Sequence, residues 1–315
     1  MKKGKKSRLQ KSLEYAVAYS IISAVRRAPL TIVKIISKFL GDILFFVSKK
    51  RRDIAVENLR HAFSAEKTEK EIRELARECC RSFFFNALET IKFNYLFTRP
   101  DMADRMKEKT GNLYETFKKA KKIHDGSGGC IFVTPHIGSW EMFPHITASL
   151  GLPLVIVARP MDNEHIEKLV FANRSSSGQV IIPKKNALFA LRKTLREGSS
   201  VGMLPDQSTM KGLMIDFFGR PATTTPVPAL LSIAYNRPIV VTACCRGKGE
   251  FQYEGFVSDP IMPGEYTDKK AEIIRLTEEM TREMESIIRK YPEQYLWIHN
   301  RWKTYKGKKA ILSGI

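Results

Sequence analysis

The spacing of apolar positions changes partway along the chain, and this change separates two kinds of structure. Residues 57–63 and 70–95 place apolar side chains at helical intervals. From Gly128 onward, short β-rich runs alternate with amphipathic segments. The pattern therefore predicts a mostly helical part in roughly the first hundred residues, followed by a body of strands and helices.

The second part is expected to contain a parallel sheet. Strands separated by helices are typical of crossover connections, so the predicted fold class is α/β, with a mostly parallel central sheet flanked by helices. No internal repeat or low-complexity tract interrupts it. The expected strands are residues 130–134, 154–158, 180–182, 201–204, 239–244 and 251–257, and the expected helices are residues 140–150, 163–174, 187–197, 228–235 and 269–290.

The first 52 residues combine apolar runs with strong positive charge. They hold fourteen Lys and Arg against two acids, and residues 301–315 hold five against none, so only about +3 of the net charge of +20 is left between them. The uncharged run at residues 15–25 is shorter than the roughly 18 residues of a simple membrane span. We expect residues 1–52 to be a basic amphipathic segment that anchors the protein on an anionic membrane.

Other interpretations of this segment stay open. It is compatible with one tilted span, with an amphipathic helix packed on the protein's own core, and with a signal peptide, although no clean small-x-small cleavage site follows. The basic cluster at residues 49–52 favours the cytoplasmic side of the membrane. The remaining divisions are a helical lead-in at residues 53–109, an α/β domain at 110–305 and a basic tail at 306–315. Five cysteines without a CxxC spacing indicate a reducing compartment and argue against a disulfide frame.

Residues 130–141 carry the strongest candidate for chemistry. A buried strand ends at Pro135, which cannot continue its ladder, and delivers His136 at the carboxyl edge where open α/β sheets bind ligands. Ser139 is expected to cap the next helix, with Glu141 in its first turn. An imidazole beside a carboxylate suits a general base because its unperturbed pKa is about 6.5. Free backbone N–H groups at the helix start would stabilise an oxyanion. Alone, His-x4-Glu is a weak pattern.

Four further blocks accompany it: ARPMDN at 158–163, LPDQ at 204–207, FFGRPAT at 217–223 and PEQYLWIHNRWK at 292–303. Together the five blocks resemble the bacterial lipid A late acyltransferase family of lauroyl/myristoyl type, within the His-x4-Asp/Glu glycerolipid acyltransferase superfamily. Two departures, TPVP at 225–228 in place of a glycine-containing turn and Asn300 in place of a basic residue, leave donor and acceptor preference open.

The resemblance implies roles for particular residues. His136 would be the base, Glu141 its partner, and Asp206 a second orienting acid at the end of another strand. Arg159 would bind acceptor phosphate or hold the site together, although an ion pair with Asp206 is the structural alternative. Arg301 and Lys303 would meet headgroup phosphate or anchor the tail at the interface. The expected substrate-binding residues are Arg159, Asn163, Gln207, Arg301 and Lys303.

The function implied by this resemblance is O-acyl transfer. A fatty acyl chain would move from an acyl thioester, carried by acyl carrier protein or coenzyme A, to a hydroxyl of a lipid A-type glycolipid. The place would be the inner membrane, with the active site facing the cytoplasm. No metal and no cofactor beyond the thioester co-substrate is expected. The alternatives are an acyltransferase for another glycolipid or a lysophospholipid, and a basic membrane-associated adaptor without enzymatic activity.

Three other features of the sequence would indicate a serine nucleophile, a metal site or a nucleic-acid partner. GSSVG at 198–202 fits the GxSxG rule, but a helix precedes it and a strand follows, the reverse of a nucleophile elbow, so Ser200 is not expected to be a nucleophile. A metal site could use His136, Glu141 and His145, but His-x4-Glu lacks the helical i, i+4 spacing that places two ligands on one face. The basic residues are interleaved with Ile, Leu and Val, which argues against a nucleic-acid partner.

Overall fold

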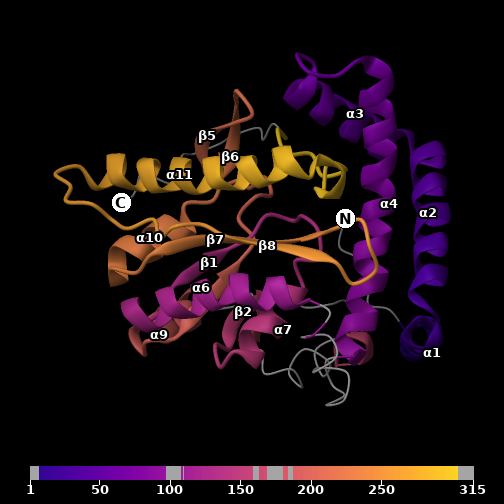
Figure 1. Cartoon of the computed structure of the whole chain (residues 1–315), viewed down its shortest axis with the longest axis horizontal. Helices are drawn as coiled ribbons and strands as arrows, with labels where there is room; N and C mark the ends of the chain where they lie inside the picture. Colours follow the sequence, from indigo (N-terminus) through magenta and orange to yellow (C-terminus); the bar gives the residue numbers. More distant parts are fainter. Residues whose placement is uncertain are drawn as a thin grey trace.

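The computed structural model describes residues 7–96, 108, 110–158, 163–168, 180–183 and 187–303. Its N-terminal part is helical, as the apolar spacing predicts (Figure 1). The four helices are α1 (Arg8–Arg27), α2 (Leu30–Val47), α3 (Lys49–Phe63) and α4 (Glu69–Leu96). The prediction of residues 70–95 matches α4 to within one residue at each end, whereas α3 begins eight residues earlier than its apolar pattern indicated.

The α/β part is built on a six-stranded sheet with the order β3-β2-β4-β1-β7-β8. Five strands are parallel, and the edge strand β8 runs antiparallel to β7. All six strands expected from the sequence are present, so the prediction of a mostly parallel central sheet is confirmed. The strands are β1 (Ile131–Val133), β2 (Leu154–Ala158), β3 (Val180–Pro183), β4 (Ser200–Met203), β7 (Ile239–Arg246) and β8 (Tyr253–Val257).

Helices cover both faces of the sheet (Figure 1). Alternate residues of each strand point to opposite faces, so Phe132 joins one core with α6 and α7, while Ile131 and Val133 join the core of α9, α10 and α11. Helices α3 and α4 contribute to this second core as well. The covering helices are α6 (Gly111–Ser127), α7 (Met142–Ser149), α9 (Ala187–Arg196), α10 (Val227–Tyr235) and α11 (Lys269–Lys290).

A β-hairpin stands apart from the main sheet and was not predicted as strands. It pairs β5 (Leu213–Phe217) with β6 (Arg220–Thr224) in antiparallel register. Phe218 and Gly219 form its two-residue turn, both with positive φ, as such hairpin turns require. The side-chain carboxylate of Asp216 accepts a hydrogen bond from the Gly219 N–H at 2.8 Å, which fixes the turn.

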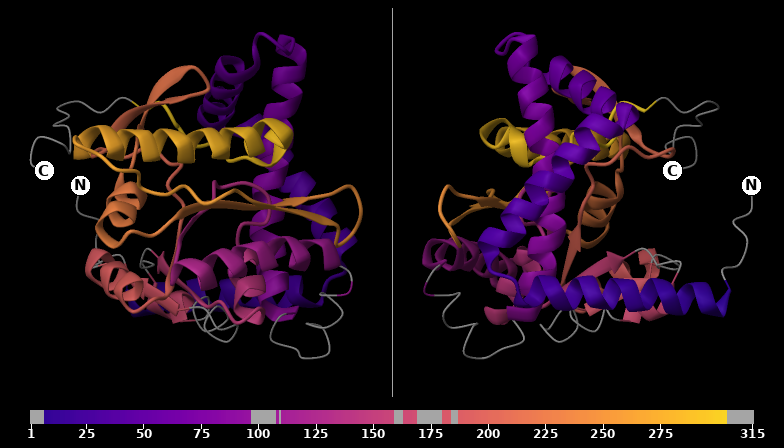
Figure 2. Two further views of the ribbon diagram at one scale, coloured as in Figure 1. Left: turned by 60° about the vertical axis from the view of Figure 1, so that its left-hand side comes forward. Right: turned by 90° about the vertical axis from the view of Figure 1, so that its right-hand side faces the viewer.

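Helix α2 is packed tightly along α4. A Cβ at Gly41 would lie 2.4 Å from the Cα of Arg81, so the two backbones approach too closely for any other residue. The carboxylate of Asp42 pairs with both Arg77 and Arg81 at 2.7 Å. Figure 2 shows α1 turning away from this pair and running across the base of the molecule. Within the described residues, the helices are too short or too polar to cross a bilayer.

Candidate functional site

The sheet register brings two ionisable side chains together at the carboxyl ends of neighbouring strands. In the parallel pair β1–β4, Val133 is aligned with Met203. His136 and Asp206 each follow three residues later, so equal lengths of chain leave the sheet side by side. The Nδ1 atom of His136 lies 2.6 Å from Oδ1 of Asp206. The backbone N–H of His136 donates to Oδ2 of the same carboxylate at 2.8 Å.

This contact determines which nitrogen of His136 is available for chemistry. A carboxylate only accepts hydrogen bonds, so Nδ1 carries the proton that it donates to Asp206, and the lone pair lies on Nε2. The side-chain amide of Gln207 lies 3.3 Å from Nε2 and donates to it. The imidazole is 18% exposed, whereas Asp206 is 2% exposed, so the imidazole faces the solvent side and the carboxylate lies behind it.

Asp206 is ionised despite its burial. Burial alone raises the pKa of this carboxyl. The charge of His136, the hydrogen bonds from its ring and backbone, and the charge of Arg301 outweigh that effect and hold the pKa of Asp206 below its ordinary value. The phenol of Tyr295 is buried beside the same group, and burial followed by the charge of Asp206 raises the pKa of Tyr295 well above its usual range.

Backbone contacts hold the loop that carries His136. The carbonyl of His136 accepts the N–H of Leu296 at 3.1 Å, and the N–H of Ser139 donates to the carbonyl of Cys244 at 2.7 Å. Gly138 has a φ of 57°, and a Cβ there would lie 2.2 Å from the carbonyl oxygen of Cys244. Glycine is therefore required at this position, since any side chain would push the loop off β7.

The segment after the loop differs from the expectation. Helix α7 begins at Met142, with Glu141 at the N-cap position and not in the first turn. Ser139 does not cap it, because its hydroxyl donates to the buried carboxylate of Glu89. Glu141 lines the same cavity as His136. In this geometry the acid that contacts the Nδ1 atom of His136 is Asp206, the group expected only as a second orienting acid.

An apolar cavity of about 180 Å³ opens beside His136, between α7 and strands β1, β2 and β4. The ring of Trp140 packs edge-on against the imidazole, with 5.3 Å between the ring centroids. The polar groups in the lining include His136 and Glu141. The apolar walls include Phe132, Leu154, Ile156, Val157, Gly202 and Leu204.

Two other predicted substrate-binding residues have structural partners. Arg301 is 2% exposed, and its guanidinium donates to the carbonyl of Thr223 at 2.8 Å and to the hydroxyl of Thr224 at 2.6 Å. It ties the C-terminal block to the hairpin, and this placement does not fit the expected contact with a headgroup phosphate. Asn163 is buried, and its amide donates to the carbonyl of Lys11 at 2.9 Å, so it connects its segment to α1.

The other expected positions have different outcomes. Lys303 is exposed at the end of the described chain. Arg159 lies outside the described residues. Ser200 is fully buried at the amino end of β4, at the opposite edge of the sheet from His136. Its hydroxyl lies 2.8 Å from Nδ1 of His124 and accepts the N–H of Cys130 at 2.9 Å. These bonds tie β4 to α6 and to the start of β1, a structural role for Ser200. Among the described residues, no group of three or more His, Cys, Asp or Glu is placed to hold a metal ion.

Comparison with known proteins gives matches along most of the chain. The model of a family described as bacterial lipid A biosynthesis acyltransferase matches residues 1–304. The lipid A biosynthesis palmitoleoyltransferase of Escherichia coli (strain K12) is 28% identical over 262 residues, which cover 81% of this chain and 80% of the relative. The lipid A biosynthesis lauroyltransferase of the same organism is 25% identical over 291 residues, covering 90% and 89%.

Proposed function

Since this chain belongs to the bacterial lipid A biosynthesis acyltransferase family and is an acyltransferase, we propose that His136 is the general base that activates the acceptor hydroxyl. The observation that carries this proposal is the His136–Asp206 pair at the mouth of an apolar cavity. The pair leaves the Nε2 lone pair available, and the cavity suits a fatty acyl chain. The acceptor is a hydroxyl of a lipid A-type glycolipid, and the donor is an acyl thioester of acyl carrier protein or coenzyme A.

The proposed reaction needs one proton acceptor. Nε2 of His136 takes the proton of the acceptor hydroxyl as its oxygen attacks the thioester carbonyl, and a C–O bond forms. The tetrahedral intermediate then collapses, the C–S bond breaks, and the imidazolium returns the proton to the leaving thiolate. The products are an ester and a free thiol. Asp206 stabilises the imidazolium that forms between these steps, because its carboxylate stays ionised beside Nδ1.

Arg159 keeps the role that the family resemblance implies, whereas the role of partner to His136 passes from Glu141 to Asp206. Glu141 is on the wall of the cavity that contains His136, where its charge would act on the reacting groups. Arg159 directly follows β2 in the sequence, and the bidentate fork of an arginine suits an acceptor phosphate.

We expect the apolar cavity to determine acyl chain length. Gly202 lines it from β4, and a Cβ there would lie 3.3 Å from Cγ1 of Ile156 and 3.6 Å from Cδ1 of Leu154, so a side chain would fill cavity space. Gly202→Val should shorten the preferred chain by about two or more carbons, because the filled space no longer accepts the terminal methylenes. The measurement is mass spectrometry of the product formed from a mixture of acyl thioesters.

Gly126→Ala is the matched control for this substitution. Gly126 is in α6, and a Cβ there meets nothing within 4 Å. An active Gly202→Val protein whose products have the wild-type chain lengths would show that the acyl chain binds elsewhere.

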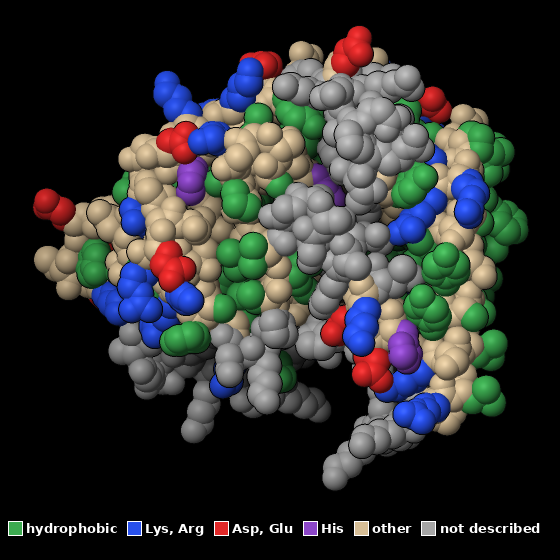
Figure 3. Space-filling view, turned by 90° about the horizontal axis from the view of Figure 1, so that it is seen from below, with side chains coloured by type: hydrophobic (Ala, Val, Ile, Leu, Met, Phe, Trp, Pro, Cys, Tyr) green, Lys and Arg blue, Asp and Glu red, His purple; other side chains and the backbone are tan. Residues whose placement is uncertain are grey.

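We propose that α1 and α2 hold the protein on the inner face of the cytoplasmic membrane. One side of α2 is packed on α4, and the other side exposes apolar residues, which Figure 3 shows gathered along this edge of the molecule among Lys and Arg side chains. An apolar face flanked by basic residues is typical of helices that lie in an anionic interface. The exposed apolar residues are Leu9, Leu13, Val17, Tyr19 and Ile21 on α1, and Ile32, Ile35, Ile36, Phe39, Ile43, Phe46 and Val47 on α2.

Phe39→Glu is expected to weaken binding to anionic vesicles about tenfold or more. Phe39 is 65% exposed on α2. The substitution removes an apolar side chain that would insert into the bilayer, and it adds a negative charge that anionic headgroups repel. Flotation with phosphatidylglycerol vesicles at low and high salt measures the effect. Met214→Glu, at a 57% exposed position on β5, is the control. Equal losses from the two substitutions would contradict membrane binding through α2.

The activity itself is tested with purified protein, a lipid A precursor and acyl thioesters of both carriers. The expected product is the precursor with one additional ester-linked acyl chain, detected by mass spectrometry. Transfer to a lysophospholipid but not to the lipid A precursor would favour the alternative substrate class. Binding of both lipids without turnover would favour the adaptor.

A further inference from the structure

A second, larger cleft lies between α2, α4 and the turn that follows β7. Its volume is about 520 Å³. Lys34 and Lys38 of α2 line one wall, Ser82 of α4 lies opposite, and Lys248 and Gln294 belong to the C-terminal half of the chain. None of the residues predicted to be functional from the sequence lines this cleft.

The charges that line the cleft are unbalanced. Three of its cations are satisfied by acids: Arg81 pairs with Asp42 and Glu78, Arg246 with Glu89, and Lys290 with Glu254. The other three are Lys34, Lys38 and Lys248, which have no ion pair with any described residue. Glu293 is the remaining acid in the lining. Three uncompensated ammonium groups around one concave space attract an anion of more than one charge.

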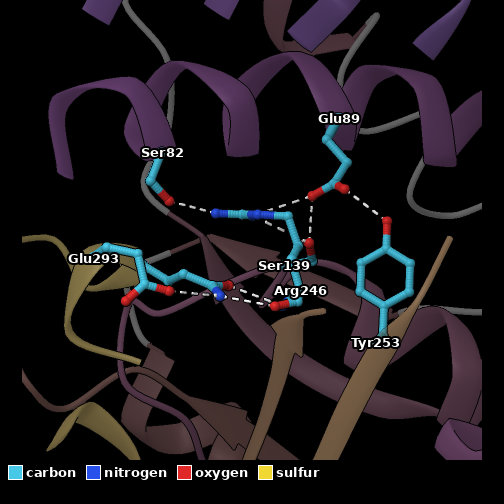
Figure 4. Close-up of polar contacts among 7 residues, drawn as sticks. Ser82, Glu89, Ser139, Arg246, Tyr253 and Glu293 are labelled. Atoms are coloured by element: carbon cyan, nitrogen blue, oxygen red, sulfur yellow. Dashed lines mark hydrogen bonds and ion pairs between the residues drawn. The ribbon is translucent and has the colours of Figure 1, made fainter. Parts of the chain in front are cut away.

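The floor of the cleft is held by a buried polar network (Figure 4). The guanidinium of Arg246 lies 3.2 Å from the carboxylate of Glu89 and 3.3 Å from the hydroxyl of Ser139, and it also donates to the hydroxyl of Ser82. The hydroxyl of Tyr253 donates to the other oxygen of Glu89 at 2.6 Å. Because Ser139 belongs to the loop of His136, this network connects the lining of the cleft to the loop of the candidate base.

The cleft also approaches the imidazole directly. A small pocket of about 10 Å³ shares Ser82 and Gln294 with the cleft and His136 and Trp140 with the surroundings of the apolar cavity. The cleft and His136 therefore lie on either side of one small pocket.

We propose that this cleft binds a phosphate group of the lipid acceptor. The inference rests on the proposed function and names how the acceptor is recognised. Helix α2 turns Lys34 and Lys38, one helical turn apart, toward the cleft, and it exposes Phe39 and Ile43 on its outer side. An anion whose acyl chains lie in the bilayer would thus reach the cleft beside the membrane-facing helix. The position of the cleft beside α2 favours a ligand that is embedded in the bilayer over a donor on a water-soluble carrier.

The test removes the unpaired charges from the full-length protein. Lys34→Gln/Lys38→Gln/Lys248→Gln is expected to raise KM for a phosphorylated lipid A precursor at least tenfold, with kcat within about threefold of wild type. The ratio of KM between the dephosphorylated and the phosphorylated precursor should fall toward one. Lys122→Gln/Lys269→Gln/Lys270→Gln removes the same charge from exposed positions on α6 and α11 and is the matched control.

A binding measurement separates this inference from the catalytic proposal. His136→Ala protein is titrated with phosphorylated and dephosphorylated precursor in detergent micelles, so affinity is read without turnover. The phosphorylated lipid should bind at least tenfold tighter, and the three cleft substitutions should abolish the difference. An unchanged preference, or a rise in KM for the acyl thioester alone, would overturn the assignment of the cleft to the acceptor.

Discussion

Replacing His136 with alanine is expected to lower kcat by about three orders of magnitude, because the substitution removes the lone pair that accepts the hydroxyl proton. The ring lies at the edge of the cavity with 18% of its surface exposed, and it is not part of either hydrophobic core. Stability should fall moderately, because the substitution leaves the buried Asp206 carboxylate without the imidazole that it contacts. Steady-state assays with a lipid A precursor and an acyl thioester measure the loss in kcat.

The controls for this prediction are thermal unfolding of the same variant, expected to show a cooperative transition at a lowered midpoint, and vesicle flotation, expected to match wild type. A variant that folds, binds vesicles and turns over within about tenfold of wild type would remove His136 from the reaction. Loss of vesicle binding together with activity would instead point to a damaged fold.

The centre of the sheet could be predicted in detail because strands β1 and β7 are buried on both faces. Nearly continuous apolar runs such as residues 239–244 differ from the amphipathic segments around them, and all residues of β7 except the last are buried. The hairpin was not predicted, because its strands do not form runs that are buried on both faces. Along β5, buried and exposed residues alternate. The turn contains Phe218 with a positive φ, a conformation that is uncommon for phenylalanine and is not expected from the sequence. Helix α6 was also missed, although Leu113, Phe117 and Ala120 are spaced as on a buried helix face.

The identity of the acid beside His136 could not be derived from local spacing. Glu141 is five residues away in sequence, and a folded-back loop was a reasonable expectation. Asp206 is 70 residues away and reaches the imidazole through the register of β1 and β4. Positions at the ends of two predicted strands indicated the same sheet edge, but strand order decides which ends are neighbours. That order is a property of the whole fold.

Contacts of the helical lead-in with distant parts of the chain could not be predicted from local spacing either. Residues 53–109 were expected to precede the catalytic body, with no role assigned to them. In the structure the amide of Asn58 donates to the carbonyls of Trp297 and His299, both at 2.8 Å. The block at 292–303 in turn bonds the carbonyl of His136 through Leu296. The helices before the α/β part therefore brace the loop of the candidate base.

Asp206→Asn is expected to lower kcat by about two to three orders of magnitude with a smaller change in KM. The amide of asparagine can donate to Nδ1, which places the imidazole proton on Nε2 and removes the lone pair that the reaction uses. Asp206 acts through His136 and is a positioning residue. The test must therefore also measure which nitrogen of the His136 ring carries the proton. Nitrogen NMR of labelled imidazole should show the proton on Nδ1 in wild type and on Nε2 in the variant.

Glu141→Gln is the matched comparison, because it neutralises the other carboxylate near the same imidazole. We expect the NMR signature of the wild-type tautomer to persist in Glu141→Gln, whatever its rate. A tautomer that changes in Glu141→Gln and not in Asp206→Asn would reverse the two assignments.

The pH dependence of stability gives an independent check on Asp206. Its pKa is lower in the folded protein than the value of about 3.9 expected in the unfolded chain, so the carboxylate stabilises the fold fully above that pH. This stabilisation is lost as the pH falls through the folded-state pKa. The stability difference between wild type and Asp206→Asn should accordingly be constant near neutral pH and shrink below about pH 4. A difference that stays the same on acidification would mean that the charge of Asp206 does not support this site, and the proton on Nδ1 would then need another cause.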